Sequence, residues 1–258
     1  VLNGDMKISQ RGTSFAGTSA YTLDRWQSKQ AGGGAFTTSQ SADSPDDFTN
    51  SLLVTVTTAD AIDAASDRYW METRLEGNSV SHLNFGSSAA KEVTLSFYVK
   101  SSIAGTYAGA LLNGDANRGY IFNYTISSAN TWERKTVTIS GDTTGTWATD
   151  TGIGMVIKFN LGSGSDYIAS AGSWAVSNGF NTSGSTQLIS TNSSTWQITG
   201  VQLEVGSVAT PFEHRSYGEE LALCQRYFIA YGGTGEVMFS IGTILSNRAY
   251  TNFQLPNE

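Results

Sequence analysis

The 258-residue chain contains few residues of the kinds that form compact catalytic or metal centres. Cys224 is the only cysteine, which excludes an internal disulfide. The two histidines, His82 and His214, lie far apart in the sequence, and no His, Cys and Asp cluster has the spacing of a metal site. Neither a G-x-S-x-G motif nor a phosphate-binding loop is present. We therefore expect no catalysis and no cofactor.

Charge is also scarce. Charged residues make up 14% of the chain, the net charge is -7, and lysine and arginine form no cluster. A nucleic-acid-binding protein needs a basic surface to displace counterions from phosphates, so we expect no nucleic-acid partner. No apolar run approaches the roughly 18 residues of a membrane-spanning helix, so no membrane insertion is expected. The first residue, Val1, and the ending at Glu258 lead us to expect a partial chain.

Alternating apolar and polar residues recur throughout the first two hundred residues. This period of two is typical of antiparallel strands with one buried face. Stretches rich in Gly, Ser, Asn and Thr separate the strands and indicate turns. The pattern predicts an all-β antiparallel sandwich of the jelly-roll type. The predicted strands are 52–58, 69–77, 93–101, 119–127, 132–140, 153–161 and 196–206.

One helix is expected near the end, from about Ser216 to Phe228. Ser216 and Glu219 form a capping-box pattern, and Cys224 falls on the apolar side, where we expect a buried thiol. Gly232 and Gly233 end the helix, and "EVMFSIGTIL" and "RAYTNFQL" read as two further strands. The predicted organisation is therefore a sandwich over 1–212, a helical junction over 213–230 and a partial C-terminal β-segment over 231–258.

Several long motifs occur in order: "NGDMKISQRGTSF", "YTLDRW", "VTLSFYVKSSIAGTY", "TWERKTVTISGDTTGTW" and "ITGVQLEVGSVATPFEHRSYGEELALCQRYF". Over residues 3–230 the chain resembles a β-sandwich module found in bacteriophage tail fibres and related virion proteins. The resemblance implies a jelly roll like that of carbohydrate-binding modules, a homotrimer, contacts with other virion proteins and a place in the virion. It also implies a structural role for His214. Four tryptophans inside the motifs are expected to pack: Trp26, Trp132, Trp147 and Trp196.

Related sugar-binding jelly rolls often hold a structural calcium ion near the N-terminus and the last strand. Here the matching places hold Lys7 and the pair Thr199 and Gly200, which leaves Asp5 and Glu204 as oxygen donors. Calcium takes roughly six to eight oxygen ligands, so Asp5 and Glu204 are weak candidates for such a site.

Aromatic residues outside the core pattern are candidates for sugar binding, because flat rings stack on pyranose faces. By alternation Trp70 shares a strand face with Glu72 and Arg74, and Tyr98 shares a polar face with Lys100. If the strands are neighbours in one sheet, they form one wet face that carries Trp70 and Tyr98. The alternative is that Trp70 packs beneath a loop or against another subunit. The candidate binding residues are Trp70, Glu72, Arg74, Tyr98, Asn123, Lys158 and, at the rim of the sandwich, Trp174.

The resulting hypothesis is a non-enzymatic phage virion protein, a tail fibre or similar appendage, that binds carbohydrate on the host surface. Two alternatives stay open at this point. The first is a ligand-free component such as a capsid-decorating or baseplate protein. The second is a polysaccharide-degrading enzyme, for which Glu72 and Glu76 on one strand face are the candidate carboxylates.

Overall fold

The chain is described by a computed structural model that covers residues 1–17, 20–230, 241–245 and 248–252. It divides into two compact units, Val1–Phe228 and Ile229–Glu258. The first contains the whole β-sandwich and the helix α2. The second contains a hairpin of β13 (Ile241–Leu245) and β14 (Arg248–Asn252). Parts of the two predicted C-terminal strands, and Gly232 and Gly233, lie outside the described residues. The predicted boundaries at 212 and 230 stay predictions.

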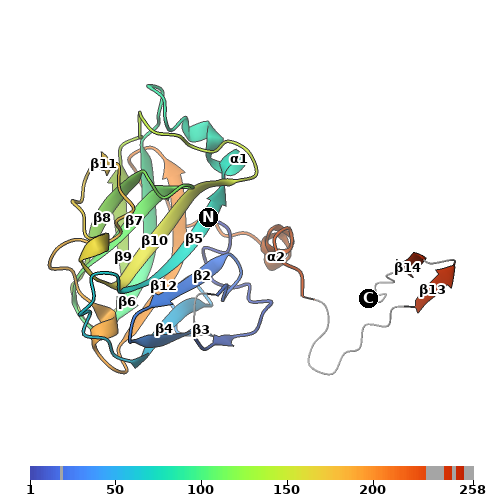
Figure 1. The fold of residues 1–258 in the computed structure, drawn as a ribbon, viewed down its shortest axis with the longest axis horizontal. Helices are drawn as coiled ribbons and strands as arrows, with labels where there is room; N and C mark the ends of the chain where they lie inside the picture. The colour runs from blue at the N-terminus through green and yellow to red at the C-terminus, as the bar shows by residue number, and fades with distance from the viewer. Residues whose placement is uncertain (18–19, 231–240, 246–247, 253–258) are drawn as a thin grey trace. The chain divides into compact units, whose positions relative to one another are not determined.

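Two six-stranded antiparallel sheets form the sandwich (Figure 1). The predicted all-β jelly-roll sandwich followed by one short α-helix is thereby confirmed. Sheet A has the order β1 (Ser14–Phe15), β3 (Ala35–Ser41), β4 (Ser51–Thr58), β12 (Thr195–Val205), β6 (Val93–Ser101) and β9 (Glu133–Ile139). Sheet B has the order β11 (Trp174–Ala175), β8 (Gly119–Ile126), β7 (Gly105–Asn113), β10 (Ile153–Ser163), β5 (Arg68–Glu76) and β2 (Trp26–Ala31).

Short helical turns connect some of the strands. They are α1 (Gly77–Val80), η1 (Ser81–Leu83), η2 (Ser165–Tyr167) and η3 (Leu188–Ser190). Among the described residues, no helix has the length and apolar character needed to cross a membrane.

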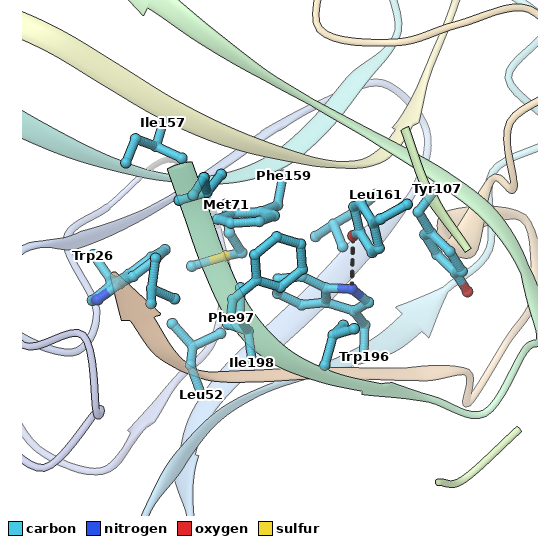
Figure 2. Packing of buried hydrophobic residues seen from close by; sticks show 14 of the residues in the cluster. Trp26, Leu52, Met71, Phe97, Tyr107, Ile157, Phe159, Leu161, Trp196 and Ile198 are labelled. Carbon is cyan, nitrogen blue, oxygen red and sulfur yellow. Dashed lines mark hydrogen bonds between the residues drawn. The ribbon is translucent and has the colours of Figure 1, made fainter. Parts of the chain in front are cut away.

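Aromatic and aliphatic side chains together fill the core between the two sheets (Figure 2). Phe159 on β10 contacts Phe97 on β6 edge-to-face, with ring centroids 5.1 Å apart. Trp196 on β12 lies 5.7 Å from Phe159, and its indole N–H donates to the Tyr124 hydroxyl at 3.2 Å. The interior faces of both sheets therefore interdigitate, as the period-two pattern predicted. Trp26 and Trp196 are fully buried, which confirms their packing role.

The helix α2 (Tyr217–Gln225) begins with the predicted capping box. The Ser216 hydroxyl accepts from the backbone N–H of Glu219 at 3.3 Å, and the Glu219 carboxylate accepts from the backbone N–H of Ser216 at 3.0 Å. The helix packs on the sandwich: Arg226 pairs with Glu76 at 2.7 Å, and the Cys224 thiol is buried. Burial raises the pKa of Cys224 to about 12, so the thiol is inert, as expected.

Loops cover part of the outer face of each sheet. Between β10 and β12, the loop residues Tyr167, Ala169 and Phe180 pack on outward side chains of sheet B. Over sheet A, Phe48 packs on Tyr98 and on the bulge of β12 at Gly200. Gly200 has φ +64°, and an added Cβ would lie 2.7 Å from the Phe48 ring, so this approach requires glycine. These loops therefore cover part of each flat face of the sandwich.

Candidate functional site

Four of the predicted binding residues lie together on the outer face of sheet B. Glu72 on β5 is directly opposite Lys158 on β10 in the strand register. The Glu72 carboxylate accepts from the Trp70 indole at 2.7 Å and from the Arg74 guanidinium at 2.9 and 2.6 Å. The sequence therefore placed these side chains on one face correctly.

A loop covers this group. The Phe180 ring lies 4.8 Å from the Trp70 ring, and Trp70 is only 9% exposed. Tyr167 lies 5.0 Å from Phe180 and extends the cover. Trp70 thus packs beneath a loop, as the alternative interpretation held, and its ring offers no open face for stacking.

Tyr98 does not share this face, which corrects the expectation of one wet surface carrying both rings. Its strand, β6, belongs to sheet A, while β5 belongs to sheet B. Alternation along a strand assigns the face of a residue but not the sheet that the strand joins. Tyr98 packs on Phe48 instead, whose ring also lies 5.1 Å from His214. Asn123 lies on the outer face of β8 and accepts from the Thr182 hydroxyl at 2.8 Å.

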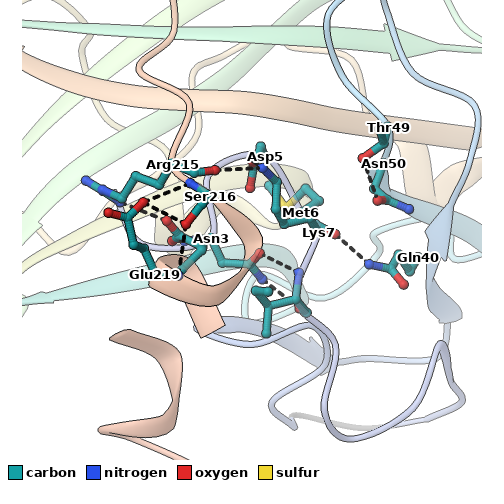
Figure 3. Close-up of polar contacts among 12 residues, drawn as sticks. Asn3, Asp5, Met6, Lys7, Gln40, Thr49, Asn50, Arg215, Ser216 and Glu219 are labelled. Atoms are coloured by element: carbon teal, nitrogen blue, oxygen red, sulfur yellow. Dashed lines mark hydrogen bonds and ion pairs between the residues drawn. The ribbon is translucent and has the colours of Figure 1, made fainter. Parts of the chain in front are cut away.

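The calcium candidates Asp5 and Glu204 already contact other side chains, and one Asp5 carboxylate oxygen is buried without a hydrogen-bond partner among the described residues. The Lys7 ammonium pairs with Asp5 at 2.6 Å and also donates to the backbone carbonyl of Arg215 at 3.2 Å (Figure 3). A positive side chain thus already lies against the Asp5 carboxylate. Glu204 accepts from the hydroxyl and the N–H of Thr210 at 2.5 and 3.2 Å. Burial alone would raise the pKa of Glu204, but hydrogen bonds from Thr210 and Gln202 hold it below its ordinary value.

A cluster of three acidic side chains lies in the loop between β4 and β5. Carboxylate oxygens of Asp60, Asp63 and Asp67 lie within 4.8 Å of one another. Asp60 already accepts from the backbone N–H groups of Gly33 and Gly34 at 3.0 and 3.2 Å. Three carboxylates carry six oxygens, and calcium takes roughly six to eight. The contacts of Asp60 account for it as a support of the loop.

A pocket of 230 Å³ opens at the rim of the sandwich, beside α1 and η1. We call it the rim pocket. The rings of Phe85 and Trp147 line it, with buried Met155, Val80 and Leu83 at its apolar side. The remaining lining residues are uncharged: Ser81, Asn84, Ser87, Ala148 and Thr149. A small pocket with apolar rings and neutral polar groups is typical of a site for a neutral, hydroxyl-rich ligand.

The rings of the rim pocket are fixed by edge-to-face contacts. Phe85 lies 4.9 Å from Trp147 at an interplanar angle of 81°, and Trp174 lies 5.4 Å from Trp147 at 90°. The Trp174 indole donates to the backbone carbonyl of Ser140 at 2.6 Å. Trp174, the predicted rim residue, thus supports the pocket from beside it. All three rings are half-buried.

A buried ion pair holds Trp147 in place. The Trp147 indole donates to Asp142 at 3.2 Å, and Arg118 forms two hydrogen bonds to the same carboxylate, at 2.8 and 2.6 Å. Burial alone would raise the pKa of Asp142, but the bonds from Arg118 and the backbone of Thr144 lower it. The carboxylate therefore stays ionised and orients the ring, which reduces the ordering cost of ligand binding.

Sequence reasoning missed Phe85 and treated Trp147 as a packing residue. Both lie in turn-rich stretches, "HLNFGSS" and "DTTGTW". The same signal, an aromatic residue in a Gly-rich and Ser-rich loop, singled out Trp174. Applied to every loop, it would have selected all three rings.

A larger cleft of 310 Å³ lies between β5, β12 and α2. Its arginines include Arg215 and Arg226, which pair with Glu220 at 2.9 Å and Glu76 at 2.7 Å. These cations already have partners, so the cleft offers a ligand less than the rim pocket does.

No family model and no curated protein matches the chain. Among solved structures, a putative sugar binding protein from Bacteroides thetaiotaomicron is 12% identical, with a TM-score of 0.44 over 80% of this chain and 99% of that one. A CBM4 structure is 16% identical, with a TM-score of 0.42 over 79% and 98%. The enzymatically active domain of tailspike protein 4 of bacteriophage CBA120 is 14% identical, with a TM-score of 0.40. The likeness covers 70% of this chain but only 19% of the tailspike chain. At these identities and TM-scores, the similarities carry no information about a ligand.

Proposed function

We propose that this chain is a non-enzymatic module of a phage appendage, such as a tail fibre, that binds a host-surface glycan in the rim pocket. The observation that carries the binding site is the pair of fixed rings, Phe85 and Trp147, in an otherwise neutral pocket. The assignment to a phage particle rests on the ordered sequence motifs over residues 3–230.

The chemistry of the lining suits a sugar. The apolar face of a pyranose packs on an aromatic ring, and its hydroxyls exchange hydrogen bonds with amide and hydroxyl groups. Asn84 and Thr149 supply such groups at the pocket. The volume of 230 Å³ is smaller than the roughly 300–1,000 Å³ of sites for drug-sized ligands. The pocket therefore takes one sugar residue of a longer glycan.

A glycan array of host lipopolysaccharides, followed by titration of the best ligand, tests the proposal. Phe85→Ala removes one ring, and Thr149→Val removes one hydroxyl with little change of shape. We expect at least a tenfold loss of affinity for Phe85→Ala and a smaller loss for Thr149→Val. Trp132→Ala is the matched control, since this half-buried ring immediately precedes β9 of sheet A. The proposal would be contradicted if the wild-type protein bound no glycan on the array, or if all three variants lost affinity equally.

A ligand-free structural role is the second candidate. The loop cover over Trp70 favours it, because the ring that the sequence offered for stacking serves packing. The enzymatic alternative has less support: Glu72 and Glu76 are both held in ion pairs, with Arg74 at 2.6 Å and with Arg226 at 2.7 Å. Release of reducing ends from host polysaccharide, abolished in Glu72→Gln, would require that alternative.

A further inference from the structure

The outer face of sheet B carries an excess of positive charge in an acidic protein. Four cationic side chains interact electrostatically there: Lys29, Arg68, Arg74 and Lys158. Glu72 is the acidic side chain among them. The whole chain has a net charge of -7, so this local surplus runs against its overall charge.

Glu72 is already fully engaged. Besides the Trp70 indole and the Arg74 guanidinium, it accepts from Gln27 at 3.0 Å when the Gln27 amide is turned to satisfy both of its neighbours. In that orientation, Gln27 also accepts from Lys29 at 3.2 Å. Arg74 therefore has an ion-pair partner, whereas Lys29, Arg68 and Lys158 form no ion pair within the described part of the chain. Arg68 donates to the Tyr167 hydroxyl at 2.6 Å.

Of the three cations without an ion pair, Lys158 is the most deeply buried. Its ammonium lies 4.4 Å from the centre of the Trp70 ring and 5.2 Å from that of Phe180. Among the residues that the structure describes, it makes no ion pair within 4.0 Å and no hydrogen bond, although the residue is only 9% exposed. Burial lowers its pKa to about 8; Glu72 opposes this shift, and the neighbouring cations add to it. Ring faces alone compensate a buried ammonium only in part.

A second unsatisfied donor lies on the same strand face. Asn160 follows Lys158 by two residues on β10 and is opposite Trp70 in the register. The residue is fully buried, and its amide nitrogen has no hydrogen-bond partner within the described part of the chain. Buried donors without acceptors are rare in folded proteins and cost free energy. The Lys158 ammonium also has no hydrogen-bond partner among the described residues, so two donors on one strand face lack an acceptor.

We propose that the outer face of sheet B, between Lys158 and Lys29 beside Trp70, binds an oxyanion: the carboxylate of an acidic polysaccharide or a phosphate. The oxyanion would accept from the Lys158 ammonium and supply the counter-charge that Lys29 and Arg68 lack. The approach is from the β2 side, where Lys29 and Arg74 are partly exposed. This site is separate from the rim pocket, and its ligand class differs, since the rim pocket is uncharged.

Titrations with tetragalacturonate, with its carboxyl-reduced neutral form and with inorganic phosphate test the proposal. At low salt we expect at least one of the two anions to bind and the neutral form to bind at least tenfold more weakly. The NMR signal of the Lys158 side chain should report a higher pKa when the anion is bound. Tetragalacturonate binding alone assigns the site to a sugar carboxylate, and phosphate binding alone assigns it to a phosphate group.

The variants locate the site. Lys158→Met and Lys29→Met should each weaken anion binding at least tenfold. Lys91→Met removes the same charge from an exposed loop position and should leave binding unchanged. Phe85→Ala should also leave it unchanged, so a failure of the rim pocket and a failure of this site are distinguishable. The proposal is overturned if neither anion binds, or if Lys158→Met binds it as tightly as Lys91→Met.

Discussion

Lys158 is a residue whose burial makes stability depend on pH in a defined direction. Its pKa falls from 10.5 to about 8 on folding, chiefly because burial disfavours the charged form. Between pH 8 and 10.5 the unfolded chain therefore binds more protons, and the free energy of unfolding rises with pH. Below pH 8 the burial of the charge costs up to about 3 kcal/mol, at about 1.4 kcal/mol per pKa unit.

Lys158→Met removes this cost. We expect the variant to be more stable than the wild type at pH 7 by roughly 1–3 kcal/mol, and the difference to shrink toward pH 10. Urea denaturation at pH 7 and 9.5, in a buffer without phosphate or carboxylate, measures both values. Lys91→Met is the control for the change of net charge. A destabilised Lys158→Met, or a difference that does not vary with pH, would contradict this assignment.

Asp142 is a residue on which both stability and the rim pocket depend. Its carboxylate is 1% exposed and holds Arg118 and the Trp147 indole. Asp142→Asn leaves the Arg118 charge without its anion, so we expect a loss of about 3 kcal/mol and weaker binding in the rim pocket. Because the folded pKa of Asp142 is lowered, its contribution is present above the unfolded pKa and disappears as the pH falls through the folded value. Asp150→Asn, at an exposed position, should change neither property.

At the scale of elements, seven strands of the sandwich were predictable, whereas β2, β3 and β7 and the partners of all the strands were not. The strand predicted over 93–101 is β6, and the strand predicted over 153–161 lies within β10. Alternation reveals one strand at a time because each strand has one buried face. Which sheet a strand joins depends on contacts between residues far apart in the chain, such as Glu72 opposite Lys158. The loop that carries Phe180 has no period, so its position over Trp70 left no signal in the sequence.

The helix α2 is an element whose start was visible in the sequence and can be tested directly. Ser216→Ala removes the acceptor for the Glu219 N–H and should cost about 1 kcal/mol, whereas Ser216→Gly should cost only a few tenths. Urea denaturation gives the totals, and hydrogen exchange of the Glu219 amide reports the local opening. Equal losses in the two variants would show that the cap hydroxyl is not what stabilises the first turn.

At the scale of the whole molecule, loops cover part of each flat face and leave the rim open. The rim combines aromatic rings with serine, threonine and asparagine. These are residue types that the low-charge composition favours. A binding function placed at the rim therefore agrees with the composition of the chain as well as with its fold. For the candidate site, the sequence could predict only which types of residue take part. The residues themselves come from loops that are far apart in the sequence and meet only in the folded chain.

Under the proposed function, the rim pocket holds one sugar and binds it weakly, so attachment to a host would require several copies. We expect a homotrimer, with a mass near 82 kDa for three chains of 27.5 kDa. Linked sites raise the overall affinity by roughly 10²–10⁴ without new contacts. Sedimentation equilibrium measures the mass, and binding to polysaccharide immobilised at low and high density measures the gain. Dense surfaces should retain the wild type at concentrations where sparse ones do not, and Phe85→Ala should lose retention on both. A single-chain mass, with retention independent of density, would instead indicate a module that contributes one site to a larger particle.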